Sequence, residues 1–287
     1  SAASDVYKRQ LQGSMQGSAE LVEAGYTQIH QYMRKIGWDY SEHPNSSSLD
    51  HKDGVHGEVI YDLFIRQYIF KLSIHANEKA LDGDRGKLID RQRNEMKTQT
   101  TPSWYKLNGN WDEWQQLKWK FKIPKDFRPS GSFTHLHQLK AQEGNNGSPV
   151  ITITARSNGN GSNRRIQIIH NGDTEETTKG TIIDNLPLED FEDEWIQVET
   201  EMHYTHNGSF SITLSRLSDG KRLVQRSFDD IDLWRKGAIS IRNKFGIYRS
   251  FGKTLTDEND RPTNGIKDEH ILLCLLYTSD AADDRIS

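Results

Sequence analysis

Three short segments of the sequence, 91–97, 133–138 and 242–248, place ionisable side chains at every second residue. Side chains two apart on a β-strand point the same way, so each segment would present one polar face as a strand. A dry core suits such faces poorly because an unpaired buried charge loses its hydration at high cost. A wet cleft that binds anions suits them well. The residues are Arg91, Arg93, Glu95 and Lys97 in the first segment, His135 and His137 with Gln138 on the other face in the second, and Arg242, Lys244 and Tyr248 around Gly246 in the third.

The same faces have a second interpretation, in which outward-facing residues form cross-strand ion pairs and Arg93 and Glu95 neutralise each other. Any one segment alone fits both interpretations equally well.

The elements that must position these residues are mainly β-strands. From Val59 onward apolar residues recur at every second position, as in 117–123, and turn clusters such as Asn108–Asn110 and Asn207–Gly208 separate the segments. Many short strands with regular Gly/Asn turns predict an all-β fold, a sandwich or jelly roll. Further strands are expected at 68–75, 91–97, 133–140, 150–155, 165–170, 195–204, 210–217 and 238–248, with one helix at 19–36 and a polar loop at 44–50.

Both ends of the chain read as adaptor sequence. Ser1–Gln10 can be back-translated into a sequencing-library transposase adaptor, and Cys274–Asp284 into its reverse complement. Such segments are set aside before the fold is considered. We therefore expect one domain at 11–273 between adaptor-derived tails at 1–10 and 274–287. The alternative is a genuine apolar strand at Ile271–Tyr277.

The remaining composition excludes several classes of function. The tails carry +1 and −2, so the net charge changes from −4 to −3, which does not favour a nucleic-acid binder. The single cysteine, Cys274, lies in a suspected tail, and no apolar run approaches a membrane span. The N-x-S patterns at Asn45, Asn146, Asn160 and Asn207 are compatible with secretion. We expect a secreted monomer that contacts neither nucleic acid nor membrane.

In order along the chain, the three polar segments resemble the motifs of the jelly-roll alginate lyases. There, R-(S/T)-E-L-R, Q-I-H and Y-F-K-A-G-x-Y-N-Q strands line the substrate cleft. Arg93–Lys97, His135–His137 and Lys244–Tyr248 match them in turn, and the context from Trp195 to Ser250 is similar to heparin and glucuronan lyases. The resemblance spans about Gly57–Ser250. It differs at Lys97, at His135 in place of glutamine, and at Arg249–Ser250 in place of Asn-Gln.

The resemblance implies a concanavalin-like β-jelly-roll sandwich and a polysaccharide lyase that cleaves a uronic-acid glycan by β-elimination. Arg93 and His135 would neutralise the carboxylate, Tyr248 would act as acid, and His137 or ionised Tyr248 as base. Lys244 would place positive charge near the Tyr248 hydroxyl. The other substrate-binding candidates are Arg91, Glu95, Lys97, Arg242 and Gln138, the last only if a bulge turns it to the polar face.

The implied partner is an anionic polysaccharide. Glucuronan-like chains are expected first and alginate second, because His135 replaces the glutamine that helps to hold the carboxylate. Heparin-type chains come third because the domain lacks net positive charge. No cofactor and no catalytic metal site are expected, whereas a structural calcium ion, as in some relatives, stays open.

Two other classes compete with the lyase. A glycoside hydrolase needs two carboxylates that flank the bond, and Asp190, Glu192 and Glu194 alternate, although a solvated acidic loop explains them better. A carbohydrate-binding module or lectin would use exposed tryptophans, for which Trp104, Trp111, Trp114 and Trp119 are the candidates, although packing is their commoner role.

Overall fold

The structure is a computed structural model that describes residues 38–44, 56–76, 91–98, 108–158, 161–250 and 265–280. The helix expected at 19–36 and the N-terminal tail lie outside these residues, as do Trp104 and all of the expected loop except Pro44. Within them the regular secondary structure is almost entirely β-strand, with one short 3-10 turn at Leu188–Asp190. No helix that it describes has the length and hydrophobicity of a membrane span.

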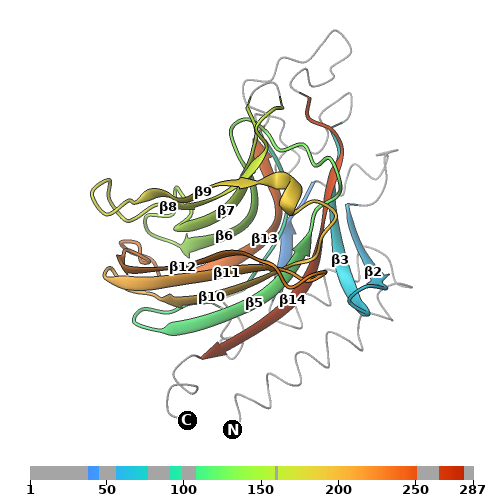
Figure 1. The fold of residues 1–287 in the computed structure, drawn as a ribbon. Helices are drawn as coiled ribbons and strands as arrows, with labels where there is room; N and C mark the ends of the chain where they lie inside the picture. Colours follow the sequence, from blue (N-terminus) through green and yellow to red (C-terminus); the bar gives the residue numbers. More distant parts are fainter. Residues whose placement is uncertain are drawn as a thin grey trace.

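The strands form two antiparallel sheets that stack as two layers (Figure 1). This arrangement confirms the predicted jelly-roll sandwich. The first sheet contains, in spatial order, β1 (Trp38–Glu42), β4 (Arg91–Thr98), β13 (Ser240–Ser250), β6 (Thr134–Gln142), β7 (Ile151–Arg156), β8 (Arg165–His170) and β9 (Gly180–Pro187). The second contains β12 (Arg222–Ile231), β11 (Gly208–Arg216), β10 (Ile196–His203), β5 (Trp114–Lys122), β14 (Glu269–Asp280), β3 (Gln67–Ile74) and β2 (Gly57–Asp62).

Alternating side chains of both sheets make the core between the layers. On β5, Leu117, Trp119 and Phe121 are almost completely buried, whereas Lys118 is exposed. On the first sheet, Ile153 and Ile247 point into the same core. The predicted alternation is confirmed, and with it the side of each strand that faces away from the core. The surface of the first sheet that faces away from the core and from the second sheet is called the outer face.

The strands that the apolar pattern missed include β9 and β12, each at one edge of its sheet. Most residues of β12 are exposed or half-buried, and β9 has no fully buried residue. An edge strand borders the core less than a central strand, so it needs fewer apolar residues and its alternation is weak.

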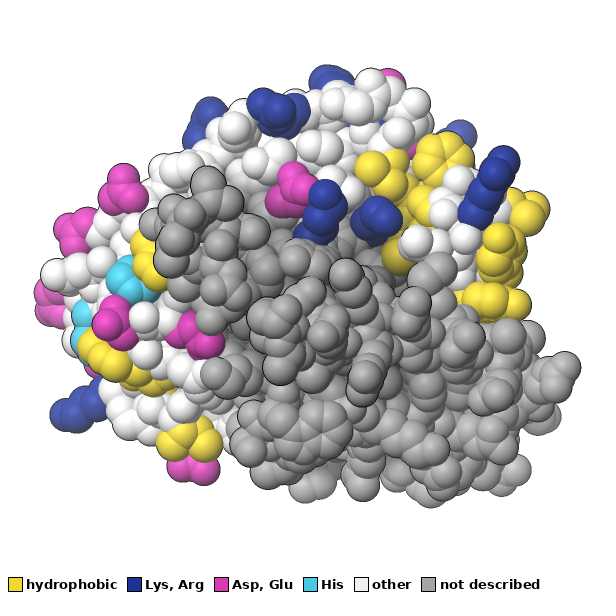
Figure 2. Space-filling view, turned by 90° about the horizontal axis from the view of Figure 1, so that it is seen from below, with side chains coloured by type: hydrophobic (Ala, Val, Ile, Leu, Met, Phe, Trp, Pro, Cys, Tyr) yellow, Lys and Arg dark blue, Asp and Glu magenta, His cyan; other side chains and the backbone are white. Residues whose placement is uncertain are grey.

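The exposed surface carries both signs of charge. On the side seen in Figure 2, Lys/Arg and Asp/Glu side chains both occur among the described residues, and hydrophobic side chains gather towards one edge. The exposed large hydrophobic residues include Tyr61, Leu63 and Phe64 in and beside the β2–β3 hairpin. No single-sign field covers this side, in line with the small net charge.

Strand β14 bears on the adaptor hypothesis. It lies between β3 and β5, and Ile271 and Leu273 are completely buried. Cys274 is also buried and lies opposite Lys120 of β5. The expected domain boundary after Leu273 therefore falls inside a strand.

The adaptor hypothesis gives the tails no part in folding, so it predicts that deleting residues 1–10 and 274–287 leaves the melting temperature unchanged within error, whereas the buried Cys274 and its pairing with β5 predict a loss. The deletion keeps Ile271 and Leu273, the core residues of β14. Differential scanning calorimetry of the full and trimmed chains tests this. A large loss of stability in the trimmed chain would show that the pairing of Cys274 and its successors with β5 belongs to the fold.

Candidate active site

Strand β4 presents its charged residues on the outer face, as the spacing predicts. The intervening side chains point inward: Gln92 donates a hydrogen bond to the carbonyl of His75 at 2.5 Å, and Met96 joins the core. Strand β13 runs beside β4 with Tyr248 opposite Arg93 and Lys244 opposite Lys97. The first and third polar segments therefore lie side by side on one surface.

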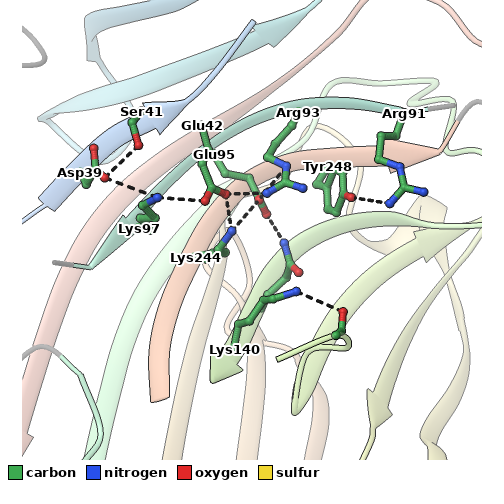
Figure 3. Close-up of polar contacts among 12 residues, drawn as sticks. Asp39, Ser41, Glu42, Arg91, Arg93, Glu95, Lys97, Lys140, Lys244 and Tyr248 are labelled. Carbon is green, nitrogen blue, oxygen red and sulfur yellow. Dashed lines mark hydrogen bonds and ion pairs between the residues drawn. The ribbon is translucent and has the colours of Figure 1, made fainter. Parts of the chain in front are cut away.

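Tyr248 is the centre of this surface. Its hydroxyl oxygen accepts a hydrogen bond from Nη1 of Arg91 at 2.9 Å, and the guanidinium carbon of Arg93 lies 3.9 Å from the centre of its ring (Figure 3). The rings of Phe133 and His135 approach it edge-on, with centroids at 5.2 and 5.8 Å. The phenol is therefore held from several sides, and the bond from Arg91 leaves the hydroxyl proton available for donation.

The glycine of the K-x-G-x-Y segment has a backbone reason. Gly246 has φ of 146°, and a Cβ added there would lie 2.1 Å from the carbonyl oxygen of Asn94 on β4. Only a residue without a side chain allows β4 and β13 to approach this closely. The close approach brings Arg93 beside Tyr248.

His137 does not lie with Tyr248, so the prediction that His135 and His137 share a face is wrong. The pairing register of β6 shifts between these two histidines, as at a β-bulge, so that Leu136 and His137 both point inward. The His137 ring packs against Trp119 and Phe245, with centroids at 5.2 and 4.6 Å. Its Nε2 and Oδ1 of Asn243 are 3.1 Å apart. Burial lowers the His137 pKa to about 4.

The same bulge brings Gln138 to the outer face, which was the condition set for its role in the site. Its Nε2 donates a hydrogen bond to Oε1 of Glu95, across β13. Arg249 points the other way, and its Nε donates to Oε1 of Gln92 at 2.8 Å in the interior. The substitution of arginine for asparagine after the tyrosine therefore changes the core and not the outer face.

An acidic residue that the sequence did not single out occupies the middle of the cations. The carboxylate of Glu42, from edge strand β1, accepts hydrogen bonds from Nη1 of Arg93 at 2.6 Å, from Nζ of Lys97 at 2.9 Å, and from Nζ of Lys244 (Figure 3). Nζ of Lys97 also lies 3.4 Å from Asp39. The sequence contains no motif around Glu42, which pairing of β1 with β4 brings into place.

Burial and ion pairing oppose each other in this cluster. Burial disfavours the charge on Glu42, but Lys244, Arg93 and Lys97 outweigh it and hold its pKa below the ordinary value. Burial raises the pKa of Glu95, although Lys244 and Arg93 act against it. Burial likewise lowers the pKa of Lys244. Because Lys244 contacts these carboxylates, it is a counter-ion inside the cluster, and it is Arg91 that contacts the Tyr248 hydroxyl.

His135 remains on the outer face beside Tyr248. Burial, then the positive charges of Arg156, Lys140 and Arg93, lower its pKa to about 3. The imidazole is therefore neutral at physiological pH, and its buried Nδ1 has no hydrogen-bond partner among the described residues. A neutral imidazole in this position can donate one hydrogen bond to an anion but adds no charge of its own.

Beyond the cluster the outer face stays basic. Arg242 lies opposite Lys140 in the pairing of β13 with β6, and Nε of Arg242 is buried without a hydrogen-bond partner in the part of the chain that is described. Nζ of Lys140 lies 3.3 Å from the carbonyl of Gly147. Burial, with Lys244 and Arg93 nearby, lowers the Lys140 pKa to about 8. Because the bulge precedes both residues, it places Lys140 on the outer face together with Gln138. Within the described ranges no three His, Cys, Asp or Glu side chains gather in a way that could hold a metal ion.

The acidic run proposed for a hydrolase is dispersed among basic partners. Glu192 forms an ion pair with Arg164, and Oδ1 of Asp193 lies 2.7 Å from Nζ of Lys122. Asp190 is 3.9 Å from Arg216. These carboxylates brace the connection into β10 and do not face each other across an open space.

The tryptophans of the lectin alternative divide into two kinds. Trp119 is in the core, and Trp114 stacks on His203 with centroids 4.5 Å apart. Trp111 is 53% exposed and contacts the rings of His206 and Trp234 edge-on. Of these, only Trp111 offers an open ring for stacking on a sugar.

Replacing His137 by alanine is expected to destabilise the fold by about 2–4 kcal/mol, as other large-to-small core changes do, and to change turnover per folded molecule only slightly. The reason is its place between Trp119 and Phe245. Urea unfolding and turnover measured on the same preparation separate the two effects. A loss of turnover as large as that of a Tyr248 variant, with stability intact, would restore His137 as the base.

Comparison with known proteins shows a similarity of fold. No protein-family model matches the sequence, and no curated protein matches it. Among solved structures, a family 7 alginate lyase, A1-II′, in complex with product has a TM-score of 0.51 at 14% identity, covering 85% of this chain and 94% of that one. An alginate lyase from Klebsiella pneumoniae has a TM-score of 0.53 at 10% identity, covering 86% and 96%. The chain thus has the jelly-roll fold of these polysaccharide lyases.

Proposed function

We propose that this protein is a polysaccharide lyase that cleaves a uronic-acid glycan by β-elimination. The observation that carries the proposal is Tyr248, whose hydroxyl accepts a hydrogen bond from Arg91 and whose ring contacts Arg93 and His135, on the outer face of a fold shared with alginate lyases. An acid–base group next to cations that can hold a carboxylate is what elimination from a uronate needs.

In the proposed reaction, a base removes the proton from carbon 5 of the uronate, next to its carboxylate. The electron pair left behind forms the double bond between carbons 4 and 5, and the bond from carbon 4 to the glycosidic oxygen breaks. The leaving oxygen takes a proton. Arg93 and neutral His135 would hold the carboxylate and stabilise the enolate that develops.

Tyr248 would serve as both base and acid. His137, the other candidate for the base, lies in the interior. Ionised Tyr248 would take the carbon 5 proton and return it to the leaving oxygen on the same side of the sugar, which is a syn elimination. The charge-assisted hydrogen bond from Arg91 would support the phenolate between these two steps.

A glucuronan-like polymer is the proposed first substrate, and alginate, on which the structural neighbours are named to act, is the second. Gln138 is committed to Glu95 and His135 replaces the family glutamine, so the carboxylate would meet a different set of groups from that in alginate lyases. Heparin-type chains rank third because the net charge is negative. We propose that the protein is secreted, acts as a monomer and catalyses the reaction with its own side chains, without a cofactor.

The test is a screen of glucuronan, alginate and heparin by ultraviolet absorbance of the unsaturated product. A rise in absorbance with one of them supports the lyase, and the preferred polymer ranks the substrates. A new saturated reducing end would show a hydrolase instead. Binding without any cleavage would support the lectin alternative, for which the exposed Trp111 is the specific observation.

A further inference from the structure

A row of polar residues crosses the outer face at the level of Tyr248. In the Cα register Tyr248 lies opposite Arg93 on one side and His135 on the other, and the row continues to Thr154 on β7 and Gln167 on β8. On one side of the row, Glu42 forms ion pairs with both Lys97 and Lys244, and beyond them Arg242 lies opposite Lys140. On the other side, over β7 and β8, the charges are not balanced in this way.

Two arginines lie directly opposite each other there. Arg156 ends β7 and Arg165 begins β8, and the two form a register pair, so that their side chains share the outer face. Like charges directly opposite on neighbouring strands destabilise a sheet. Burial lowers the pKa of Arg156 most, and the positive charge of Arg165 lowers it further, because the two like charges repel each other. A fold that keeps such a pair gains when an anion lies between the two groups.

The acid nearby neutralises only part of this charge. Oδ1 of Asp184 lies 3.7 Å from Nε of Arg165, but the same oxygen accepts hydrogen bonds from Gln167 at 2.7 Å and from the backbone N–H of Asn185 at 2.7 Å. Nε of Arg156 is buried and has no hydrogen-bond partner among the described residues. Arg156 is therefore the less satisfied guanidinium of the pair.

The distance from Tyr248 follows from the sheet. Arg156 is two strands away and Arg165 three, each displaced by two residues along its strand, which gives roughly 12 and 16 Å between Cα positions. A pyranose ring in a polymer spans roughly one strand spacing, about 4.8 Å. The pair lies some two to three sugar units from a bond held at Tyr248.

We propose that Arg156 and Arg165 form a second carboxylate-binding site, which holds a uronate two to three sugars away from the cleaved bond. This inference rests on the proposed function. A substrate that follows the row from Arg93 through His135 reaches the pair, and its carboxylate adds a second negative charge beside Asp184, whose single charge acts on both arginines. Long oligouronates gain this contact and short ones do not, so the pair makes affinity depend on chain length.

Binding is measured in the Tyr248→Phe background, which prevents cleavage, by titration calorimetry with a glucuronate disaccharide and hexasaccharide. Arg156→Gln/Arg165→Gln is expected to weaken hexasaccharide binding about tenfold to a hundredfold, the range for hydrogen bonds to charged groups. Disaccharide binding stays unchanged. Arg226→Gln, which removes an exposed arginine from β12 of the other sheet, is the matched control and is expected to change neither.

The second site is rejected if the double variant weakens the binding of both oligosaccharides equally, or if it does not weaken hexasaccharide binding. If the double variant does not fold, Arg156→Gln alone is used, with the same expected direction. The two proposals fail separately. Unsaturated product from the wild type with length-independent binding rejects only the second site, whereas length-dependent binding without unsaturated product rejects only the lyase. If neither oligosaccharide binds the parent protein, the second glucuronate site and the first rank of glucuronan are both rejected, while the ultraviolet screen decides the lyase.

Discussion

Replacing Tyr248 by phenylalanine is expected to lower turnover by about a hundredfold to ten-thousandfold, the usual contribution of a general acid–base group. A residue that acts as both base and acid belongs at the upper end. The ring contacts with Arg93 and His135 remain, so the fold and the binding of the carboxylate should survive. The loss should therefore appear in kcat and not chiefly in KM. Initial rates of unsaturated product against substrate concentration measure both.

The matched control is Tyr204→Phe, which removes a hydroxyl elsewhere. Tyr204 is buried between the sheets and donates a hydrogen bond to Oε1 of Gln115 at 2.9 Å. Its loss removes a buried hydrogen bond, so it should cost about 1 kcal/mol of stability and leave turnover per folded molecule intact. If Tyr248→Phe behaves like Tyr204→Phe and keeps nearly full production of unsaturated sugar, Tyr248 is structural and the proposed mechanism is wrong.

The shared face of β4 and the place of Tyr248 could be predicted because side-chain direction alternates strictly along a regular strand. Gln92 and Met96 point in, and Arg93 and Glu95 point out, as the sequence alone indicates. The central strands could be predicted in the same way, because apolar residues must line the core at every second position.

The bulge in β6 could not be predicted by this rule. One extra residue between His135 and Gln138 reverses the sides of everything after it, so His137 enters the core and Gln138 and Lys140 leave it. No glycine or proline marks the position in the sequence. The spacing of Leu136 and Leu139 is the signal that was available: they are three residues apart, so a regular strand could not bury both on one face. A local break in alternation is thus the step at which the site prediction failed.

Glu42 and the pair Arg156–Arg165 were missed for a different reason. Each depends on a partner on another strand: Glu42 meets Lys244, which is far away in sequence, across two strand pairings, and Arg156 meets Arg165 across a hairpin. Single-strand patterns contain no information on which strands are neighbours. The sequence therefore indicated what kinds of groups the site contains, and the sheet order decides which of them neutralise each other.

Lys244 was predicted to lie near the Tyr248 hydroxyl, but it is the counter-ion of buried carboxylates. Replacing Lys244 by methionine is expected to destabilise the fold by about 3–5 kcal/mol, the cost of breaking a buried ion pair from one side. The change keeps much of the apolar stem but removes the cation between Glu42 and Glu95. Both carboxylates are almost inaccessible to water. Calorimetric or urea unfolding at pH 7 measures the loss. Lys118→Met on β5 is the control, because Lys118 and Glu199 form an exposed pair at 2.6 Å, worth at most about 1 kcal/mol.

The pH dependence separates lost charge from lost packing. In the wild type the pKa of Glu42 lies below its ordinary value of 4.5, so its contribution to stability is present above that pH and is lost as the pH falls. Without Lys244 the buried carboxylates should bind protons more readily, which raises their folded pKa values and favours the variant below pH 4.5. The gap in stability between wild type and Lys244→Met should therefore narrow from pH 8 to pH 4. A gap that is constant over this range, or smaller than that of Lys118→Met, would show that Lys244 is not the counter-ion of the cluster.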